Sequence, residues 1–183
     1  MTGIGARVRK LDHIGIATAS MPDAVALFAG MLGGTLIAGG DNDNTGIRLM
    51  QLSCGGFKVE LMQPLRDDSL VAKRLARHGP GFHHLTFFVD DLVQTVDDLA
   101  AAGIQTVGTN LASPHWRESF LPPQLTFGTL LQLVDSTRPW DVPTTAYTID
   151  DVLNGRVVWE DYVDCLRPQV LAGEGNCYAR ERQ

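Results

Sequence analysis

Four side chains able to bind a metal occupy matching positions in two similar stretches of the chain. His13 and Glu60 lie in the first stretch, and His84 and Gln132 lie in the second. His84 follows His13 by 71 residues, and Gln132 follows Glu60 by 72. Two offsets that agree this closely indicate an internal repeat. The repeat would place the four side chains at equivalent points of two similar units.

Two imidazoles and a carboxylate, completed by a carboxamide oxygen, suit a divalent transition metal: Zn, Fe, Co, Ni or Mn. No cysteine stands beside them, which argues against a thiolate site. Glu60 lies between Val59 and Leu61, where an unpaired carboxylate is costly to bury and a cation would remove that cost. The sequence therefore predicts a metal site formed by His13, Glu60, His84 and Gln132.

The alternation and helical spacing of apolar residues predict a β-α-β-β-β unit in each stretch. In the first unit, strands are expected at 11–18, 35–38, 47–52 and 57–62, a helix from Ser20 to the Gly33-Gly34 pair, and a loop at 39–44. In the second, strands are expected at 82–89, 104–107, 119–121 and 129–134, with a helix from Asp90-Asp91 to Gly103. Residues 64–80 form a connector helix that opens at Asp67–Ser69. The first domain is thus 1–135, with modules at about 9–63 and 81–135.

The composition changes after Asp135. Residues 136–145 contain two prolines and predict a linker, and Thr148–Asp151 is typical of a helix start. Apolar side chains spaced along 152–166 then predict one or two helices broken at Asn154-Gly155. Residues 136–183 are therefore expected to be a linker and helical extension that packs on the main body or on a second subunit.

The bulk properties are those of a globular protein. The chain has 183 residues, 44% hydrophobic and 20% charged, with a net charge of −6, which disfavours a nucleic-acid partner. No segment has the length and hydropathy of a signal peptide or membrane span. Its three cysteines are widely spaced and imply no disulfide framework, so a reducing, cytoplasmic location is expected.

The sequence resembles the vicinal oxygen chelate superfamily, which includes glyoxalase I, extradiol dioxygenases and bleomycin resistance proteins, and within it most of all the methylmalonyl-CoA epimerases. The resemblance covers about residues 9–135. It is carried by Leu11-Asp12-His13-Ile14-Gly15-Ile16-Ala17, Val59-Glu60-Leu61-Met62-Gln63-Pro64-Leu65, Asp68-Ser69-Leu70-Val71-Ala72-Lys73, His78-Gly79-Pro80-Gly81-Phe82-His83-His84, Val89-Asp90-Asp91 and Gly128-Thr129-Leu130-Leu131-Gln132-Leu133.

This resemblance implies an α+β fold in which two tandem βαβββ modules form a cupped mixed sheet around a metal, with the C-terminal helical extension added. It implies that His13, Glu60 and His84 are the first three ligands and that Gln132 takes the place of a glutamate. In the epimerases that glutamate is also one of two bases, and the other aligns near Leu49. Both carboxylate bases are therefore replaced in this chain. The resemblance also implies a homodimer and a small-molecule substrate, including an acyl-CoA.

Other residues could supply what the replaced bases do not. Glu118 is the candidate proton carrier, and Gln132 keeps a candidate role at the catalytic position. Arg48, Leu49 and Thr86 are the candidate substrate-binding residues, Arg48 because it could meet an anionic group. His83 should point away from His84 along the strand, so we expect it to be structural.

Three functions fit these observations. The first is a metal-dependent isomerase or lyase of the epimerase or glyoxalase type, which stabilises an enolate-like state of a small carbonyl substrate. The second is a non-catalytic binding protein of the same fold, in which the loss of both bases reflects ligand sequestration. The third is a non-haem Fe(II) ring-cleavage dioxygenase, since two histidines and a carboxylate are its ligand set.

Overall fold

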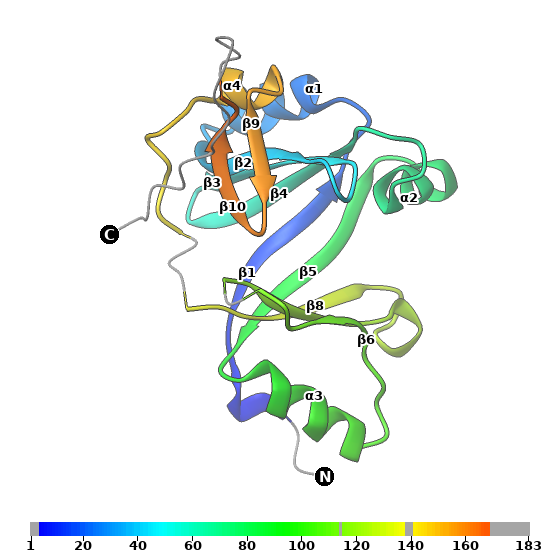
Figure 1. Ribbon diagram of the computed structural model, residues 1–183. Coiled ribbons are helices and arrows are strands. Elements are labelled where there is room, and N and C mark those ends of the chain that lie inside the picture. Colours follow the sequence, from blue (N-terminus) through cyan, green and yellow to red (C-terminus); the bar gives the residue numbers. More distant parts are fainter. Residues whose placement is uncertain (1–3, 114, 138–140, 169–183) are drawn as a thin grey trace. The chain divides into compact units, whose positions relative to one another are not determined.

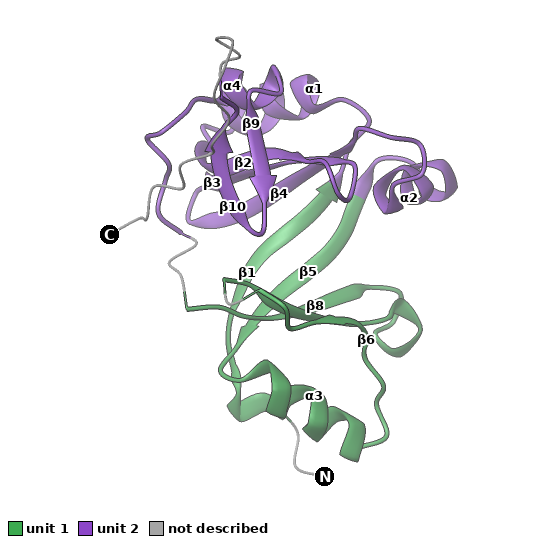
Figure 2. Cartoon of the chain, in the orientation of Figure 1, with its two compact units in different colours: residues 1–16, 82–139 green, residues 17–81, 140–183 purple. Residues whose placement is uncertain are grey.

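The computed structural model describes residues 4–113, 115–137 and 141–168. The chain forms two compact units (Figure 2). Unit 1 comprises residues 1–16 and 82–139, and unit 2 comprises residues 17–81 and 140–183. The N-terminal strand thus belongs with strands of the second half of the sequence, and the C-terminal extension belongs with strands of the first half.

Five strands of unit 1 lie in the order β1-β5-β8-β7-β6 (Figure 1). Their bounds are β1 (Val8–Ala17), β5 (Gly81–Val89), β6 (Val107–Asn110), β7 (Arg117–Leu121) and β8 (Leu130–Asp135). β5 and β8 are parallel, and β7 is antiparallel to both β8 and β6. The parallel pairing places Thr86 of β5 directly beside Gln132 of β8.

Helix α3 (Leu92–Ala101) covers this sheet, and the unit also contains the short 3-10 helices η1 (Ile4–Ala6) and η3 (Pro123–Leu125). Its N-terminus is capped by Asp91, whose side chain accepts from the backbone N–H of Gln94. Leu92 and Leu99 are buried against Val89 and Leu133, which forms the apolar core of this unit. The helix begins and ends as the sequence predicts.

Unit 2 has the strand order β10-β9-β2-β3-β4. The strands are β2 (Thr35–Asn42), β3 (Ile47–Cys54), β4 (Phe57–Pro64), β9 (Val157–Glu160) and β10 (Val163–Leu166). All neighbours are antiparallel except β2 and β9. The register of β3 and β4 sets Gln51 opposite Glu60, so both side chains lie on one face of the sheet.

Three helical segments accompany the sheet of unit 2. α1 (Met21–Val25) continues into a π-helix, η2 (Ala26–Met31), while α2 (Leu70–His78) and α4 (Ile149–Leu153) stand alone. Side chains of Ser20, Ser69 and Thr148 cap the three α-helices, as their sequences predict. α2 packs on β4 through a cluster of Ala17, Met62 and Val71.

Three segments differ from the sequence-based expectation. The strand expected at 104–107 instead runs from Val107 to Asn110 as β6, because the backbone N–H of Ile104 still bonds the carbonyl of Leu99 at the end of α3. Residues 39–42, expected to be a loop, continue strand β2, because the extension provides a neighbouring strand for it. A side chain at Gly40 would stand 3.1 Å from the backbone of Val158, so glycine lets β9 approach. Residues 157–166, expected to be helical, form the β9–β10 hairpin, and only α4 is helical in the described part of the extension.

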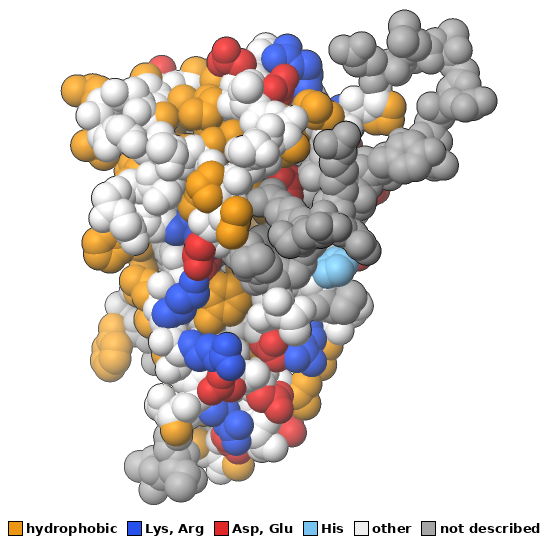
Figure 3. Space-filling model, turned by 90° about the vertical axis from the view of Figure 1, so that its left-hand side faces the viewer, with side chains coloured by type: hydrophobic (Ala, Val, Ile, Leu, Met, Phe, Trp, Pro, Cys, Tyr) orange, Lys and Arg blue, Asp and Glu red, His pale blue; other side chains and the backbone are white. Residues whose placement is uncertain are grey.

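The cysteines, the helices and the surface charges bear on the expectations drawn from composition. Cys54 has a free thiol and Cys165 is disulfide-bonded, which the spacing of the cysteines did not predict. Among the described residues, no helix combines the length and apolar character needed to span a membrane. Basic and acidic side chains are interspersed in the lower part of Figure 3. Ion pairs such as Arg7–Asp98 occur in unit 1.

Candidate functional site

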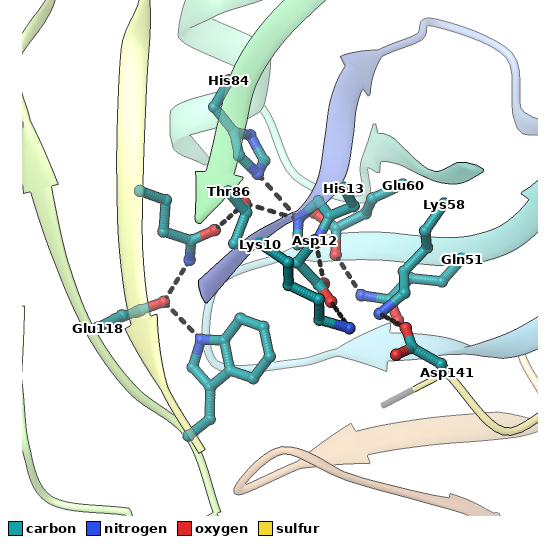
Figure 4. Close-up of polar contacts among 12 residues, drawn as sticks. Lys10, Asp12, His13, Gln51, Lys58, Glu60, His84, Thr86, Glu118 and Asp141 are labelled. Atoms are coloured by element: carbon teal, nitrogen blue, oxygen red, sulfur yellow. Dashed lines mark hydrogen bonds and ion pairs between the residues drawn. The ribbon is translucent and has the colours of Figure 1, made fainter. Parts of the chain in front are cut away.

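The two repeated histidines come together in unit 1. His13 extends from β1 and His84 from β5, and their Nε2 atoms are 3.2 Å apart (Figure 4). Both side chains are buried. The rings meet edge to face, with centroids 5.3 Å apart. The structure thus brings together the pair that the repeat singled out.

Each imidazole is held at its other nitrogen by the residue that precedes it. Nδ1 of His13 is 2.8 Å from Oδ2 of Asp12, and Nδ1 of His84 is 3.0 Å from Nδ1 of His83. A carboxylate only accepts, so Nδ1 of His13 is the donor in its contact with Asp12. Sequence reasoning missed both partners, although Asp12-His13 and His83-His84 occupy the same place in the repeat. His83, expected to be structural, in fact contacts His84.

Gly15 makes room for the imidazole of His84. A Cβ atom at this position would lie 2.3 Å from Cε1 and Nδ1 of the ring. The ring of His84 fills the space that a side chain at Gly15 would need. The imidazole of His84 therefore packs directly on the backbone of β1 at Gly15.

A chain of hydrogen bonds leads away from the histidines within unit 1. Thr86 Oγ1 lies 2.9 Å from Nε2 of His13 and donates to Oε1 of Gln132 over 2.6 Å. The amide of Gln132 donates to Oε2 of Glu118 over 2.6 Å, and the indole N–H of Trp116 donates to the same oxygen over 3.0 Å. Since a carboxylate must accept, the amide nitrogen of Gln132 faces Glu118 and its oxygen faces the histidine side. Trp116 was not singled out in the sequence.

Burial lowers the pKa of His84 well below its usual value of 6.5, and the nearby His13 and His83 lower it further. The imidazole is thus neutral at pH 7. Neutral imidazole is the form that binds metals, so the environment of His84 prepares it for that role.

Glu60 lies in unit 2 on β4 and is held by its cross-strand neighbour. The amide nitrogen of Gln51 donates to Oε1 of Glu60 over 3.0 Å. Oε1 of Gln51 is buried and has no hydrogen-bond partner among the described residues. The carboxylate is therefore oriented by a residue for which the sequence offered no signal.

Two other candidate residues are placed in unit 2. The guanidinium of Arg48 forms two hydrogen bonds to Asp41, of 2.6 and 2.9 Å, and one of 2.6 Å to the carbonyl of Leu153. These contacts tie α4 of the extension to β2 and β3, which gives Arg48 a structural function. Leu49 lies opposite Met62 in the β3–β4 register and has no group that could carry a proton.

The imidazole pair fits a metal ion. Two lone pairs facing each other across 3.2 Å would repel, so a proton or a cation must lie between the Nε2 atoms. This separation would let the two Nε2 atoms bind one divalent ion together. Among the described residues, His13, Glu60 and His84 supply the donor types of a divalent transition-metal site.

A known protein family matches the greater part of the chain. A family model described as the glyoxalase/bleomycin resistance protein/dioxygenase superfamily matches residues 12–120. The ethylmalonyl-CoA/methylmalonyl-CoA epimerase of Cereibacter sphaeroides is 28% identical over 103 residues, which cover 56% of this chain and 77% of the relative. The human mitochondrial methylmalonyl-CoA epimerase is 27% identical over 136 residues, or 73% of this chain and 77% of the relative.

Solved structures of the same class are similar in fold. Methylmalonyl-CoA epimerase from Mycobacterium tuberculosis gives a TM-score of 0.64 at 30% identity, with 75% of this chain and 93% of that chain covered. A variant of the Streptomyces coelicolor methylmalonyl-CoA epimerase, in complex with 2-nitronate-propionyl-CoA, gives 0.64 at 29% identity, covering 72% and 99%. These similarities confirm the expected fold class, a mixed sheet with few helices.

Proposed function

Because the chain belongs to the glyoxalase/bleomycin resistance protein/dioxygenase superfamily, we propose that it is a metal-dependent isomerase of the epimerase type. The substrate class would be a small acyl-CoA with an acidic carbon beside its thioester carbonyl. The observation that carries the proposal is the buried pair His13 and His84, whose Nε2 atoms face each other at 3.2 Å. Relatives named as methylmalonyl-CoA epimerases support the choice of substrate.

In this proposal His13, Glu60 and His84 hold one divalent ion, and Gln132 offers its carboxamide oxygen as a fourth donor. The metal, when bound, supplies a Lewis acid that stabilises negative charge on the substrate's carbonyl oxygen. Asp12 keeps the proton on Nδ1 of His13 and His83 supports the ring of His84, as outer partners of metal-binding histidines do. Gln51 orients the carboxylate of Glu60.

Glu118 is the group we propose to move the proton. It lies on β7, half-buried, and its Oε2 is fixed by the N–H groups of Gln132 and Trp116. The epimerases place a base at the position of Gln132. Here the carboxylate of Glu118, which accepts a hydrogen bond from Gln132, would take over that function. A positioned carboxylate that removes the proton beside a thioester carbonyl contributes about 10²–10⁴-fold to the rate.

Exchange of the acidic hydrogen with solvent tests this function. Metal-loaded protein in deuterium oxide should incorporate deuterium into methylmalonyl-CoA, measured by mass spectrometry. Glu118→Gln should lower the exchange rate by at least about 10²-fold, because an amide cannot take the proton. Glu160→Gln, the same change at an exposed residue at the end of β9, should leave it unaltered. Equal rates with and without protein would refute the isomerase.

A non-catalytic binding protein is the second candidate, favoured by the carboxamide of Gln132 and the apolar Leu49 at the positions of the two bases. It predicts saturable binding of an acyl-CoA by the metal-loaded protein without any deuterium exchange. The homodimer that the family resemblance implies also stays a prediction. Light scattering of the protein as it elutes from a size-exclusion column would test it.

A further inference from the structure

One face of the β3–β4 pair in unit 2 carries two buried polar side chains, Lys58 and Gln51, that are not among the proposed metal ligands. Lys58 and Glu60 are two residues apart on β4 and therefore point to the same face, with their Cα atoms about 6.6 Å apart. Gln51 lies opposite Glu60, so Lys58 and Gln51 are diagonal neighbours on this face. Lys58 is 6% exposed and Gln51 3%. The buried ammonium of Lys58 and the buried amide of Gln51 thus lie on the face of the sheet that Glu60 shares.

The ammonium of Lys58 is paired with a residue of the C-terminal extension. Nζ of Lys58 is 3.1 Å from Oδ1 of Asp141 (Figure 4). The two ends of this ion pair differ in environment, because the side chain of Lys58 is 4% exposed and that of Asp141 is 61% exposed. A buried cation needs an anion, whereas an exposed carboxylate is well solvated alone. Asp141 could therefore leave at small cost to itself, provided that another anion takes its place.

Gln51 sets a second requirement for any ligand that binds this face of the sheet. Its amide nitrogen is committed to Glu60, while its buried oxygen has no hydrogen-bond partner among the described residues. The opposite orientation of the amide would set its oxygen against the carboxylate of Glu60, which is unfavourable. A buried acceptor of this kind is normally satisfied by a donor. A ligand that satisfies it must bring an N–H or O–H group.

We propose that Lys58 and Gln51 form a binding site for a carboxylate ligand that also carries a hydroxyl or amide N–H. Lys58 pairs with the carboxylate, Gln51 Oε1 accepts from the donor, and Asp141 occupies the ammonium as an internal competitor until the ligand arrives. The proposal extends the function proposed above, since Glu60 shares the face. It requires no metal, so it can fail or stand independently of that function.

Calorimetric titration of metal-free, chelator-treated full-length protein with tartronate, a hydroxylated dicarboxylate, tests the site. Asp141→Ala removes the competitor and should tighten binding by about three- to tenfold, the range expected for a partly exposed ion pair. Asp67→Ala, which removes another exposed carboxylate of the same unit, should leave the affinity unaltered. Adding Lys58→Met to Asp141→Ala should abolish binding, with thermal unfolding showing that the variant is folded.

The outcomes that overturn the proposal are distinct. Unchanged or weaker binding by Asp141→Ala would show that Asp141 is not a competitor. Equal binding with and without Lys58→Met would show that the ammonium is not the receptor. For the donor, malonate should bind Asp141→Ala at least about threefold more weakly than tartronate, and Gln51→Leu should erase that difference. A difference that persists without Gln51 would rule out its role.

Discussion

The substitution Gly15→Ala tests whether the backbone of β1 sets the position of His84. The added Cβ would lie 2.3 Å from two ring atoms of His84, whereas carbon contacts are favourable at about 3.5–4.0 Å. The ring must therefore shift by about 1.2 Å or turn away. Metal ligands tolerate deviations of only about 0.2 Å, so His84 could no longer share an ion with His13. We expect affinity for Zn²⁺ or Co²⁺ to fall by at least about 10–100-fold.

Competition titration with a chromogenic chelator would measure the affinity of both proteins. Gly30→Ala is the matched control, because it makes the same change in η2 where no atom lies within 4 Å of the new Cβ. Neither position has the left-handed backbone that favours glycine, so strain at the glycine does not complicate the comparison. If Gly15→Ala binds metal as tightly as Gly30→Ala and the wild type, the proposed role of His84 is wrong.

Three further predictions concern the partners of the candidate site and the extension. Asp12→Asn should lower metal affinity about 10–100-fold in the same titration, because Nδ1 of His13 loses its carboxylate, and an unaltered affinity would contradict this reasoning. Because the pKa of folded His84 is depressed, its contribution to stability is full above about pH 6.5 and is lost as the pH falls below that value. The melting temperature of metal-free protein should therefore fall more steeply below pH 6.5 than that of His84→Asn, and equal slopes would refute the assignment. Tyr147→Phe should cost about 1–3 kcal/mol in the free energy of unfolding, measured in urea, because the buried N–H of Gly39 loses its acceptor and Asp164 its donor. A cost near zero would mean that this hydroxyl does not anchor the extension.

The extension shows where local sequence patterns were insufficient. Val152, Trp159, Tyr162 and Leu166 have a spacing that fits a helix, yet only the first belongs to one. Residues 157–166 are strands because β2 offers an unpaired edge to β9, and pairing across that edge satisfies backbone groups that a short helix would leave open. An edge contributed by residues more than a hundred positions earlier cannot be read from a local pattern.

The sequence by itself predicted the repeat, most of the strands and helices within it, and the pairing of His13 with His84. These follow from alternating apolar residues, capping side chains and equal spacings, which act within one element or between two copies of it. Only the tertiary structure decided which groups hold the histidines: Asp12 and His83 at their outer nitrogens, and the chain from Thr86 through Gln132 to Glu118. Hydrogen-bond partners depend on rotamers and strand register, and a one-residue slip in register would send each side chain to the other face.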